Sequence, residues 1–403
     1  MNKKIWFVSR SYPPSPGGGA FVRKQQVMHL RESGHNVTVI MPPQTSQASQ
    51  TTQKFKDEQV KDNTGEHFKV ISPKLPLRVG LYLERLLLIP DYMYFWGRQV
   101  TDFLINNAEE KSVVVITTGG ELGVFSHVKR IKKKRPDIKI VLSYHDLIAY
   151  AKYDGASTFS HPHQRIDKYE GEAIEFADNV LAQSEIMQEM LCEKYPQHKG
   201  KIDFIYFGFQ SDTPLLKKKQ ILDVDKITIA YAGNMGKLQS PEILIRAYRV
   251  LPTEVKNKIH LMFIGDFSNN EVISEANDVE KVGYLQRNEM LELLEGRVDI
   301  ALVSAINIKT LRPLMPTKLY EYIGLGVPLL CIVPKDCEVE RVVNKYKIGE
   351  SVTYGDEADV VKVLSSMVLN MNKINEMKKN ILDIRSEFSS ENTLEKMRIV
   401  IDL

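Results

Sequence analysis

Hydrophobic and polar positions along the chain form blocks of two kinds. Short, nearly continuous apolar runs, such as KIWFVS at 4–9 and SVVVITT at 112–118, alternate with segments in which apolar residues recur close to helical spacing, such as FVRKQQVMHLRES at 21–33. Continuous apolar runs are typical of strands that are buried on both faces of a sheet. The repeated order of strand and helix therefore predicts parallel sheets covered by helices on both sides.

This pattern occurs twice. One series ends with KIDFIYFG at 201–208, and another begins with ITIAYAGN at 227–234. We therefore expect an α/β fold with two Rossmann-like, doubly wound parallel-sheet domains that face a central cleft, with ligands beyond the carboxyl ends of the strands. The expected boundaries are an N-terminal domain at 1–208, a polar linker at 209–225, a C-terminal domain at 226–375, and a helical segment at 376–403 that could pack back on the first domain.

Two segments interrupt the alternation. The stretch at 43–65 is polar and low in complexity, so we expect it to be mobile. The stretch GLYLERLLLIPDYMYFWG at 80–97 is rich in Leu and aromatic residues but contains charges and a proline. It is either a buried helix pair or a surface that touches lipid or a lipid-linked substrate. No apolar run is long enough for a transmembrane helix, and the apolar run at the N-terminus is too short for a signal peptide.

Charge and cysteine usage narrow the function classes. The 54 basic and 51 acidic residues give a net charge of +3, which argues against bulk nucleic-acid binding. Local basic runs, KRIKKKR at 129–135 and KKK at 217–219, are solvated surfaces or contacts for an anionic membrane. The three cysteines form no C-x-x-C pair, so a reducing compartment fits best.

A glycine triplet at 17–19 follows the first predicted strand and precedes the first predicted helix. The N-terminus of a helix offers unpaired N–H groups and a partial positive charge, and glycine lets a phosphate approach the backbone. A plain tight turn is the alternative. The G-x-G-x-x-G pattern is absent and no acidic residue ends the second strand, so an NAD site is disfavoured.

Three further segments carry candidate chemistry. His145 and Asp146 end an apolar strand and would point into the cleft, although a histidine there can be purely structural. After the strand that ends at Asn234, Lys237 is either a surface lysine or a cation for a diphosphate leaving group.

The segment RPLMPTKLYEYIGLGVPLL predicts a helix that starts after Pro316. Thr317, Lys318 and Leu319 would offer first-turn N–H groups to phosphate, and Lys318 would add a charge. Glu321 would be misplaced beside a phosphate, so it suits ribose hydroxyls better. Stabilisation of the helix dipole is the alternative role for Glu321.

In order along nearly the whole chain, several segments resemble retaining GT-B glycosyltransferases of family four. They are SYPPSPGGGAFVRKQQVMHLRESGHNVTVI, EFADNVLAQSEIMQEML, GYLQRNEMLELLEGRVDIALV and PTKLYEYIGLGVPLL. The last is most similar to a subgroup with P-S/T-K-x-x-E-Y whose members build bacterial surface polysaccharides.

The resemblance implies a metal-independent hexosyltransferase-type enzyme without a cofactor. It would move a sugar from a UDP- or GDP-sugar to a glycan or lipid-linked acceptor, without nucleic-acid partners. The first domain would be the acceptor side and the second would bind the nucleotide-sugar. A cytoplasmic location follows, with peripheral contact at the inner membrane face as a further option.

The resemblance also assigns roles to matching residues. Gly18 and Gly19 would face the donor diphosphate or the acceptor, and His145 would contact the donor sugar and the reacting centre as the catalytic residue. Glu321 would hold the ribose. The phosphate would contact the backbone of three neighbouring residues, Thr317, Lys318 and Leu319.

The chain departs from the family pattern at two places. The first glutamate of E-x7-E falls at Pro313, where Arg312 is a neighbour but not a match. An Arg and Lys pair falls at Asn234 and Gln239, which leaves Lys237 as the cation of that loop. These departures keep two alternatives open: a non-catalytic accessory subunit with the same fold, and a nucleotide-sugar epimerase.

Overall fold

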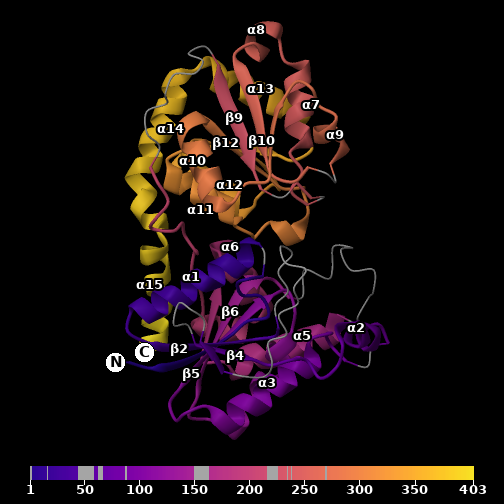
Figure 1. The fold of residues 1–403 in the computed structure, drawn as a ribbon, viewed down its shortest axis with the longest axis vertical. Helices are drawn as coiled ribbons and strands as arrows, with labels where there is room; N and C mark the ends of the chain where they lie inside the picture. Colours follow the sequence, from indigo (N-terminus) through magenta and orange to yellow (C-terminus); the bar gives the residue numbers. More distant parts are fainter. Residues whose placement is uncertain are drawn as a thin grey trace. The chain divides into compact units, whose positions relative to one another are not determined.

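The computed structural model describes residues 2–15, 17–43, 59–61, 67–86, 89–148, 163–215, 226–233, 235–236, 238–267 and 270–403. The chain divides into two compact units (Figure 1). Unit 1 comprises Met1–Phe207 and Leu394–Leu403, and unit 2 comprises Gly208–Thr393.

Unit 1 is built on an eight-stranded sheet in the order β3-β4-β2-β1-β5-β6-β7-β8. The strands pair in parallel except β3, which is antiparallel to β4. The strands are β1 (Lys4–Val8), β2 (Asn36–Met41), β3 (Gln59–Lys61), β4 (His67–Val70), β5 (Val113–Gly119), β6 (Lys139–Asp146), β7 (Asn179–Ala182) and β8 (Ile202–Phe204). The helices are α1 (Gly18–Glu32), α2 (Leu77–Arg85), α3 (Tyr94–Asn107), α4 (Val128–Lys134), α5 (His163–Phe176), α6 (Glu185–Lys194) and, at the C-terminus, α15 (Ser390–Asp402), with 3₁₀ turns at Gly123–His127 and Pro196–Lys201.

Unit 2 is built on a six-stranded parallel sheet in the order β11-β10-β9-β12-β13-β14. The strands are β9 (Ile227–Ala232), β10 (Ile259–Ile264), β11 (Glu280–Gly283), β12 (Ile300–Ser304), β13 (Leu329–Val333) and β14 (Gly349–Thr353). The helices are α7 (Glu242–Val250), α8 (Thr253–Lys256), α9 (Glu271–Ser274), α10 (Arg287–Arg297), α11 (Thr317–Leu325), α12 (Glu338–Tyr346), α13 (Glu357–Leu369) and α14 (Met371–Ile384), with 3₁₀ turns at Lys309–Leu311 and Arg385–Phe388. The prediction of two doubly wound α/β domains is confirmed.

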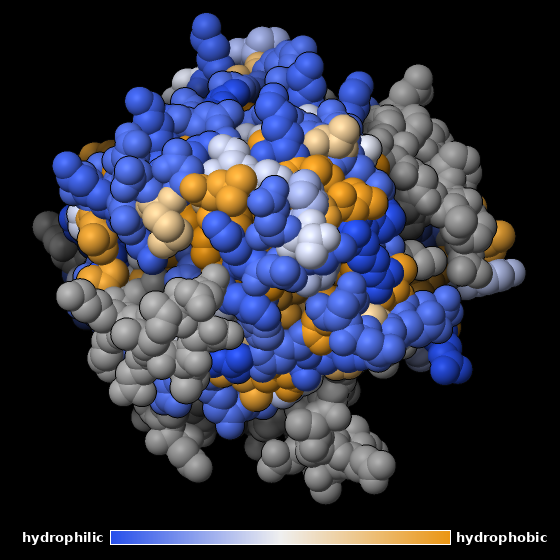
Figure 2. Space-filling model, turned by 90° about the horizontal axis from the view of Figure 1, so that it is seen from above, coloured by the Kyte–Doolittle hydropathy of each residue, from blue (hydrophilic) through white to orange (hydrophobic). Residues whose placement is uncertain are grey.

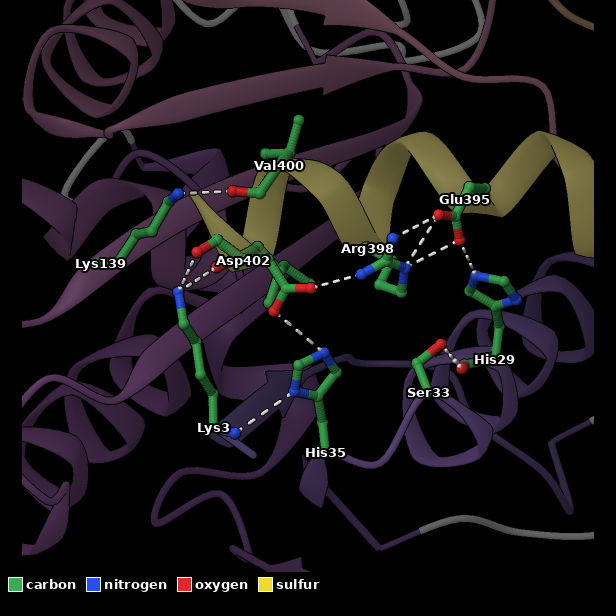
Figure 3. A network of polar contacts seen from close by, with 10 residues as sticks. Lys3, His29, Ser33, His35, Lys139, Glu395, Arg398, Val400 and Asp402 are labelled. Atoms are coloured by element: carbon green, nitrogen blue, oxygen red, sulfur yellow. Dashed lines mark hydrogen bonds and ion pairs between the residues drawn. The ribbon is translucent and has the colours of Figure 1, made fainter. Parts of the chain in front are cut away.

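The end of α15 is held in unit 1 by charged side chains (Figure 3). Lys3 Nζ donates to the carbonyl oxygens of Ile401 and Asp402 at 2.7 and 2.8 Å, and Lys139 donates to Val400 O. The Asp402 carboxylate lies 3.4 Å from His35 Nε2. Cations at the C-terminus of a helix satisfy its last carbonyls and complement its dipole, which explains why this segment packs with the first strands of the chain.

Several predicted local features differ from the structure. Helix α1 starts at Gly18, so Gly18 and Gly19 lie in its first turn rather than in a loop before it. Strand β9 ends at Ala232, two residues before the predicted end. The polar stretch at 43–65 contains the short strand β3, and its remaining residues lie mostly outside the described ranges.

The predicted linker at 209–225 begins with packed residues. Phe209 and Thr213 are 2% and 3% exposed, and Phe209 forms a bridge with Ser389. The apolar side chains of a linker segment pack where a neighbouring element offers a partner, which composition does not reveal. Residues 216–225 lie outside the described ranges.

The surface carries few contiguous apolar areas in the view of Figure 2, where hydrophilic residues dominate and apolar ones form separate groups. Among the described residues, no helix is both long enough and apolar enough to cross a membrane.

Candidate functional site

The glycine triplet forms the start of α1. Gly17 has a φ of 101° and lies at the N-cap without a side-chain cap, so the chain turns there in a conformation that favours glycine. A Cβ on Gly19 would lie 3.0 Å from Arg23 Nη1. Glycine at 19 therefore lets a guanidinium lie directly against the first turn of the helix.

His145 is the penultimate residue of β6 and is buried, at 6% exposure. Its Nε2 lies 3.2 Å from Gln26 Oε1 of α1, and its ring stacks on Phe207 with centroids 4.5 Å apart. Burial, and secondly the nearby Arg23 charge, hold the pKa of His145 well below its usual value. The imidazole is therefore neutral near pH 7, with one donor and one acceptor nitrogen.

A polar cluster around Arg23, which the sequence reasoning missed, surrounds the same edge of the unit 1 sheet. Arg23 is 5% exposed, and its Nε donates to Thr117 Oγ1 at 3.2 Å. Glu121 Oε2 accepts from Gly119 N at 3.1 Å and lies 3.4 Å from Arg10 Nε. The sequence signal that could have found this cluster is the placement of Arg23 one turn after the glycines.

Lys318 follows the first residue of α11, and its side chain reaches toward the end of β9. Its Nζ donates to Tyr231 Oη at 2.8 Å and lies 4.0 Å from the centroid of that ring. A Cβ on Gly233 would lie 3.1 Å from the same nitrogen. In the described part of the chain no carboxylate pairs with Lys318, and burial lowers its pKa to about 7.

Glu321, in the second turn of α11, is clamped by Arg287 of α10. Arg287 Nε donates to Glu321 Oε1 at 3.0 Å and its Nη2 donates to Oε2 at 3.1 Å, a two-point guanidinium–carboxylate contact. Thr213 Oγ1 donates to Oε2 at 2.9 Å. These contacts hold the carboxylate in one orientation from outside α11.

The other predicted residues of unit 2 have different surroundings. Leu319 is fully buried, and its backbone N–H donates to Pro316 O at 2.9 Å, so it is not a free donor for phosphate. Arg312 donates from Nε and Nη2 to Asp336 O at 3.0 and 2.9 Å, so its guanidinium is engaged with the backbone. Thr317 is the first residue of α11, after an N-cap proline that supplies no side-chain cap. Asn234 and Lys237 lie outside the described residues.

The structure thus groups the predicted residues by unit. Gly18, Gly19 and His145 lie at one edge of the unit 1 sheet, while Lys318 and Glu321 belong to α11 of unit 2. Among the described residues, no group of three or more His, Cys, Asp or Glu side chains is placed to hold a metal ion.

A protein-family model matches the N-terminal half of the chain. Residues 16–212, just under half of the 403-residue chain, match the family model described as Glycosyltransferase Family 4. These residues are similar to that family. The resemblance predicted from the motifs is confirmed at this level. No curated protein matches the chain in sequence.

Solved structures share the whole GT-B fold. Sucrose-phosphate synthase from Thermosynechococcus elongatus superposes with a TM-score of 0.72 at 12% identity, over 100% of this chain and 98% of that one. The glycosyltransferase WaaG, involved in lipopolysaccharide biosynthesis, gives 0.67 at 14% identity over 98% and 99%. An α,α-trehalose-phosphate synthase from Burkholderia xenovorans, in complex with glucose-6-phosphate, gives 0.69 at 10% identity over 100% of both chains.

Proposed function

We propose that the protein is a retaining glycosyltransferase that moves a sugar from a UDP- or GDP-sugar to a glycan or lipid-linked glycan in surface polysaccharide synthesis. The observation that carries the proposal is Lys318, a half-buried amine without a carboxylate partner in the described chain. It lies against Gly233 beside the uncapped start of α11. A cation and free helix N–H groups at one point are suited to a diphosphate.

The chemistry follows from where charge develops. Cleavage of the bond between sugar and nucleotide places negative charge on the departing diphosphate. Lys318 and the first-turn N–H groups of α11 stabilise that charge, because they are fixed before the reaction begins. The Glu321 carboxylate, oriented by Arg287, accepts hydrogen bonds from the ribose. His145 offers neutral hydrogen-bonding groups to the sugar that is transferred.

A donor panel tests the proposal. We expect one UDP-, GDP- or dTDP-sugar to raise the Tm of the purified protein and to release its nucleotide slowly in the absence of acceptor. His145→Ala should lower turnover and leave nucleotide binding unchanged, because His145 belongs to unit 1 whereas the proposed diphosphate contacts belong to unit 2. Absence of binding to every donor would favour the accessory subunit, and inversion of a sugar carbon without nucleotide release would mark an epimerase.

Helix α2 is the part of unit 1 that we propose contacts the membrane. It is amphipathic, and three of its apolar side chains are exposed: Val79, Leu81 and Tyr82 at 38%, 40% and 60%. The exposed basic residues Lys74 and Arg78 lie beside them in sequence. Apolar side chains flanked by cations are typical of helices that lie in an anionic membrane surface. This contact would place the enzyme at the inner membrane face.

Flotation with anionic liposomes checks this contact. We expect the wild-type protein to float at low salt and Leu81→Glu/Tyr82→Ser to stay at the bottom of the gradient. The control is Val250→Ser in unit 2, which removes an apolar side chain that is even more exposed, at 70%, and should float like the wild type. Purely soluble behaviour of the wild type at low salt would contradict the contact.

A further inference from the structure

At the carboxyl edge of the unit 1 sheet, a guanidinium and two carboxylates converge on the space beside the Cα of Gly119, called the hollow. Gly119, the last residue of β5, pairs with Asp146 of β6 after a shift in register between Thr118 and Gly119. A Cβ on Gly119 would lie 3.1 Å from Arg23 Nη2, 3.4 Å from Glu121 Oε2 and 3.7 Å from Asp146 Oδ2. Because Gly119 has no side chain, these three charged groups lie close beside its Cα, and a methyl group there would crowd the Arg23 guanidinium.

The groups around this hollow retain hydrogen-bonding capacity. In the described chain, Arg23 is bonded only through Nε, to Thr117, so Nη1 and Nη2 have no hydrogen-bond partner although the residue is 5% exposed. Within the same ranges, Asp146 makes no side-chain hydrogen bond or ion pair. In this part of the chain, neither residue has a buried side-chain atom without a partner, so these groups are open to water and equally to the hydroxyl groups of a ligand.

The charges around the hollow select the chemistry of that ligand. Two carboxylates, Glu121 and Asp146, lie near two guanidiniums. The guanidiniums are those of Arg23 and of Arg10, which is paired with Glu121. A phosphate bound here would gain the Arg23 contact but would lie within a few ångströms of both carboxylates, where like charges repel strongly. A hydroxyl group suits the site better, because it donates to a carboxylate and accepts from a guanidinium or from an N–H of the α1 first turn at the same time.

We propose that this hollow, formed by Arg23, Gly119, Glu121 and Asp146, is the acceptor subsite and that it binds adjacent hydroxyls of an uncharged sugar. This inference rests on the proposed function, which requires a sugar acceptor. It adds the chemical class of that acceptor. Glucose-6-phosphate, the ligand in one of the structurally similar synthases, would be excluded by the two carboxylates. The acceptor is thus a neutral glycan end.

The ionisation of Asp146 gives the subsite a pH dependence. Burial, opposed by Arg23, raises the pKa of Asp146 to about 6, with Glu121 adding to the rise and Arg10 opposing it. The carboxylate form, which accepts a hydrogen bond from a sugar hydroxyl, predominates above this pH. Binding of a neutral glycoside should therefore weaken as the pH falls below about 6.

Saturation-transfer NMR with the full-length protein tests the subsite. The probes are the methyl α-glycosides of glucose, galactose and mannose, with glucose 6-phosphate as the charged counterpart. We expect at least one neutral glycoside to bind and glucose 6-phosphate not to bind. Gly119→Ala, which fills the hollow with a methyl group, should weaken the glycoside at least about tenfold, as should Asp146→Asn. The matched control is Gly200→Ala, because a Cβ on Gly200 meets no atom within 4 Å.

Two outcomes would overturn the subsite: stronger binding of glucose 6-phosphate than of every neutral glycoside, or glycoside binding that Gly119→Ala leaves unchanged. Failure of every neutral glycoside to bind would also overturn it. The donor panel is run on the same variants. If the wild-type protein binds a donor but no neutral glycoside, the subsite alone is contradicted. If the wild-type protein binds no donor, the proposed function is contradicted.

Discussion

Lys318→Met is expected to weaken binding of the donor nucleotide by about 10- to 100-fold and, at the same time, to stabilise the free protein. The loss of affinity corresponds to one charge-assisted hydrogen bond to phosphate, about 1.5–3 kcal/mol. The gain in stability arises because Lys318 is half-buried without a carboxylate in the described chain, so its charged form is costly in the free protein. The substitution removes that cost and should raise Tm by a few degrees.

The pH dependence has a defined sign. The folded pKa of Lys318, about 7, lies below its ordinary value of 10.5, so between these values the unfolded chain binds more protons and stability rises with pH. A bound diphosphate favours the charged ammonium, so donor affinity should fall as the pH rises above about 7. Isothermal titration across pH 6–9 measures this fall, which Lys318→Met should abolish.

Lys258→Met is the matched control, because Lys258 is an exposed lysine of the same unit. It should change neither donor affinity nor its pH dependence. Unchanged donor affinity in Lys318→Met would show that Lys318 does not bind the diphosphate. Lys318 would then not replace the Arg and Lys pair that the family pattern has at Asn234 and Gln239. This outcome would favour a subunit that has the fold without the activity.

The architecture could be predicted from sequence because buried parallel strands have a local signature. Runs such as SVVVITT identify β5, and α11 starts directly after Pro316, as predicted. Partners across the fold have no such signature. Lys318 meets Tyr231 across 87 residues, and Arg23 meets Thr117 across 94. The sequence therefore indicated which residues carry charge but not which of those charges lack a partner.

The same limit applies to Glu321. Its position in PTKLYEY suggested a ribose ligand, but nothing in that segment indicates that Arg287 orients the carboxylate from another helix. Sequence alone also placed Gly18 and Gly19 before α1, since glycine usually disfavours the interior of a helix. The first turn tolerates them because Gly17 supplies the positive φ and Arg23 requires the space at Gly19.

Glu321→Gln is expected to remove discrimination between a nucleotide and its analogue without ribose hydroxyls. Glutamine keeps the shape of the side chain but replaces one acceptor oxygen by a donor and removes the charge. The wild-type protein should bind UDP or GDP, whichever the donor panel selects, at least about tenfold more tightly than the 2′,3′-dideoxy form. In Glu321→Gln the two affinities should become nearly equal.

The Arg287 contact requires a double-mutant cycle, because loss of Arg287 leaves the part-buried Glu321 carboxylate without its cation, whereas loss of the Glu321 charge leaves Arg287 paired with Asp212. Each of Glu321→Gln and Arg287→Gln should lower the free energy of unfolding by about 1–3 kcal/mol, and the double variant by less than the sum.

If Glu321 binds ribose, Arg287→Gln retains part of the hydroxyl discrimination while Glu321→Gln loses it. If the pair only holds α10 against α11, discrimination by Glu321→Gln matches that of the wild type, and the ribose assignment is wrong. The stability cycle and the nucleotide titrations thus separate a structural clamp from a ligand contact made by the same carboxylate.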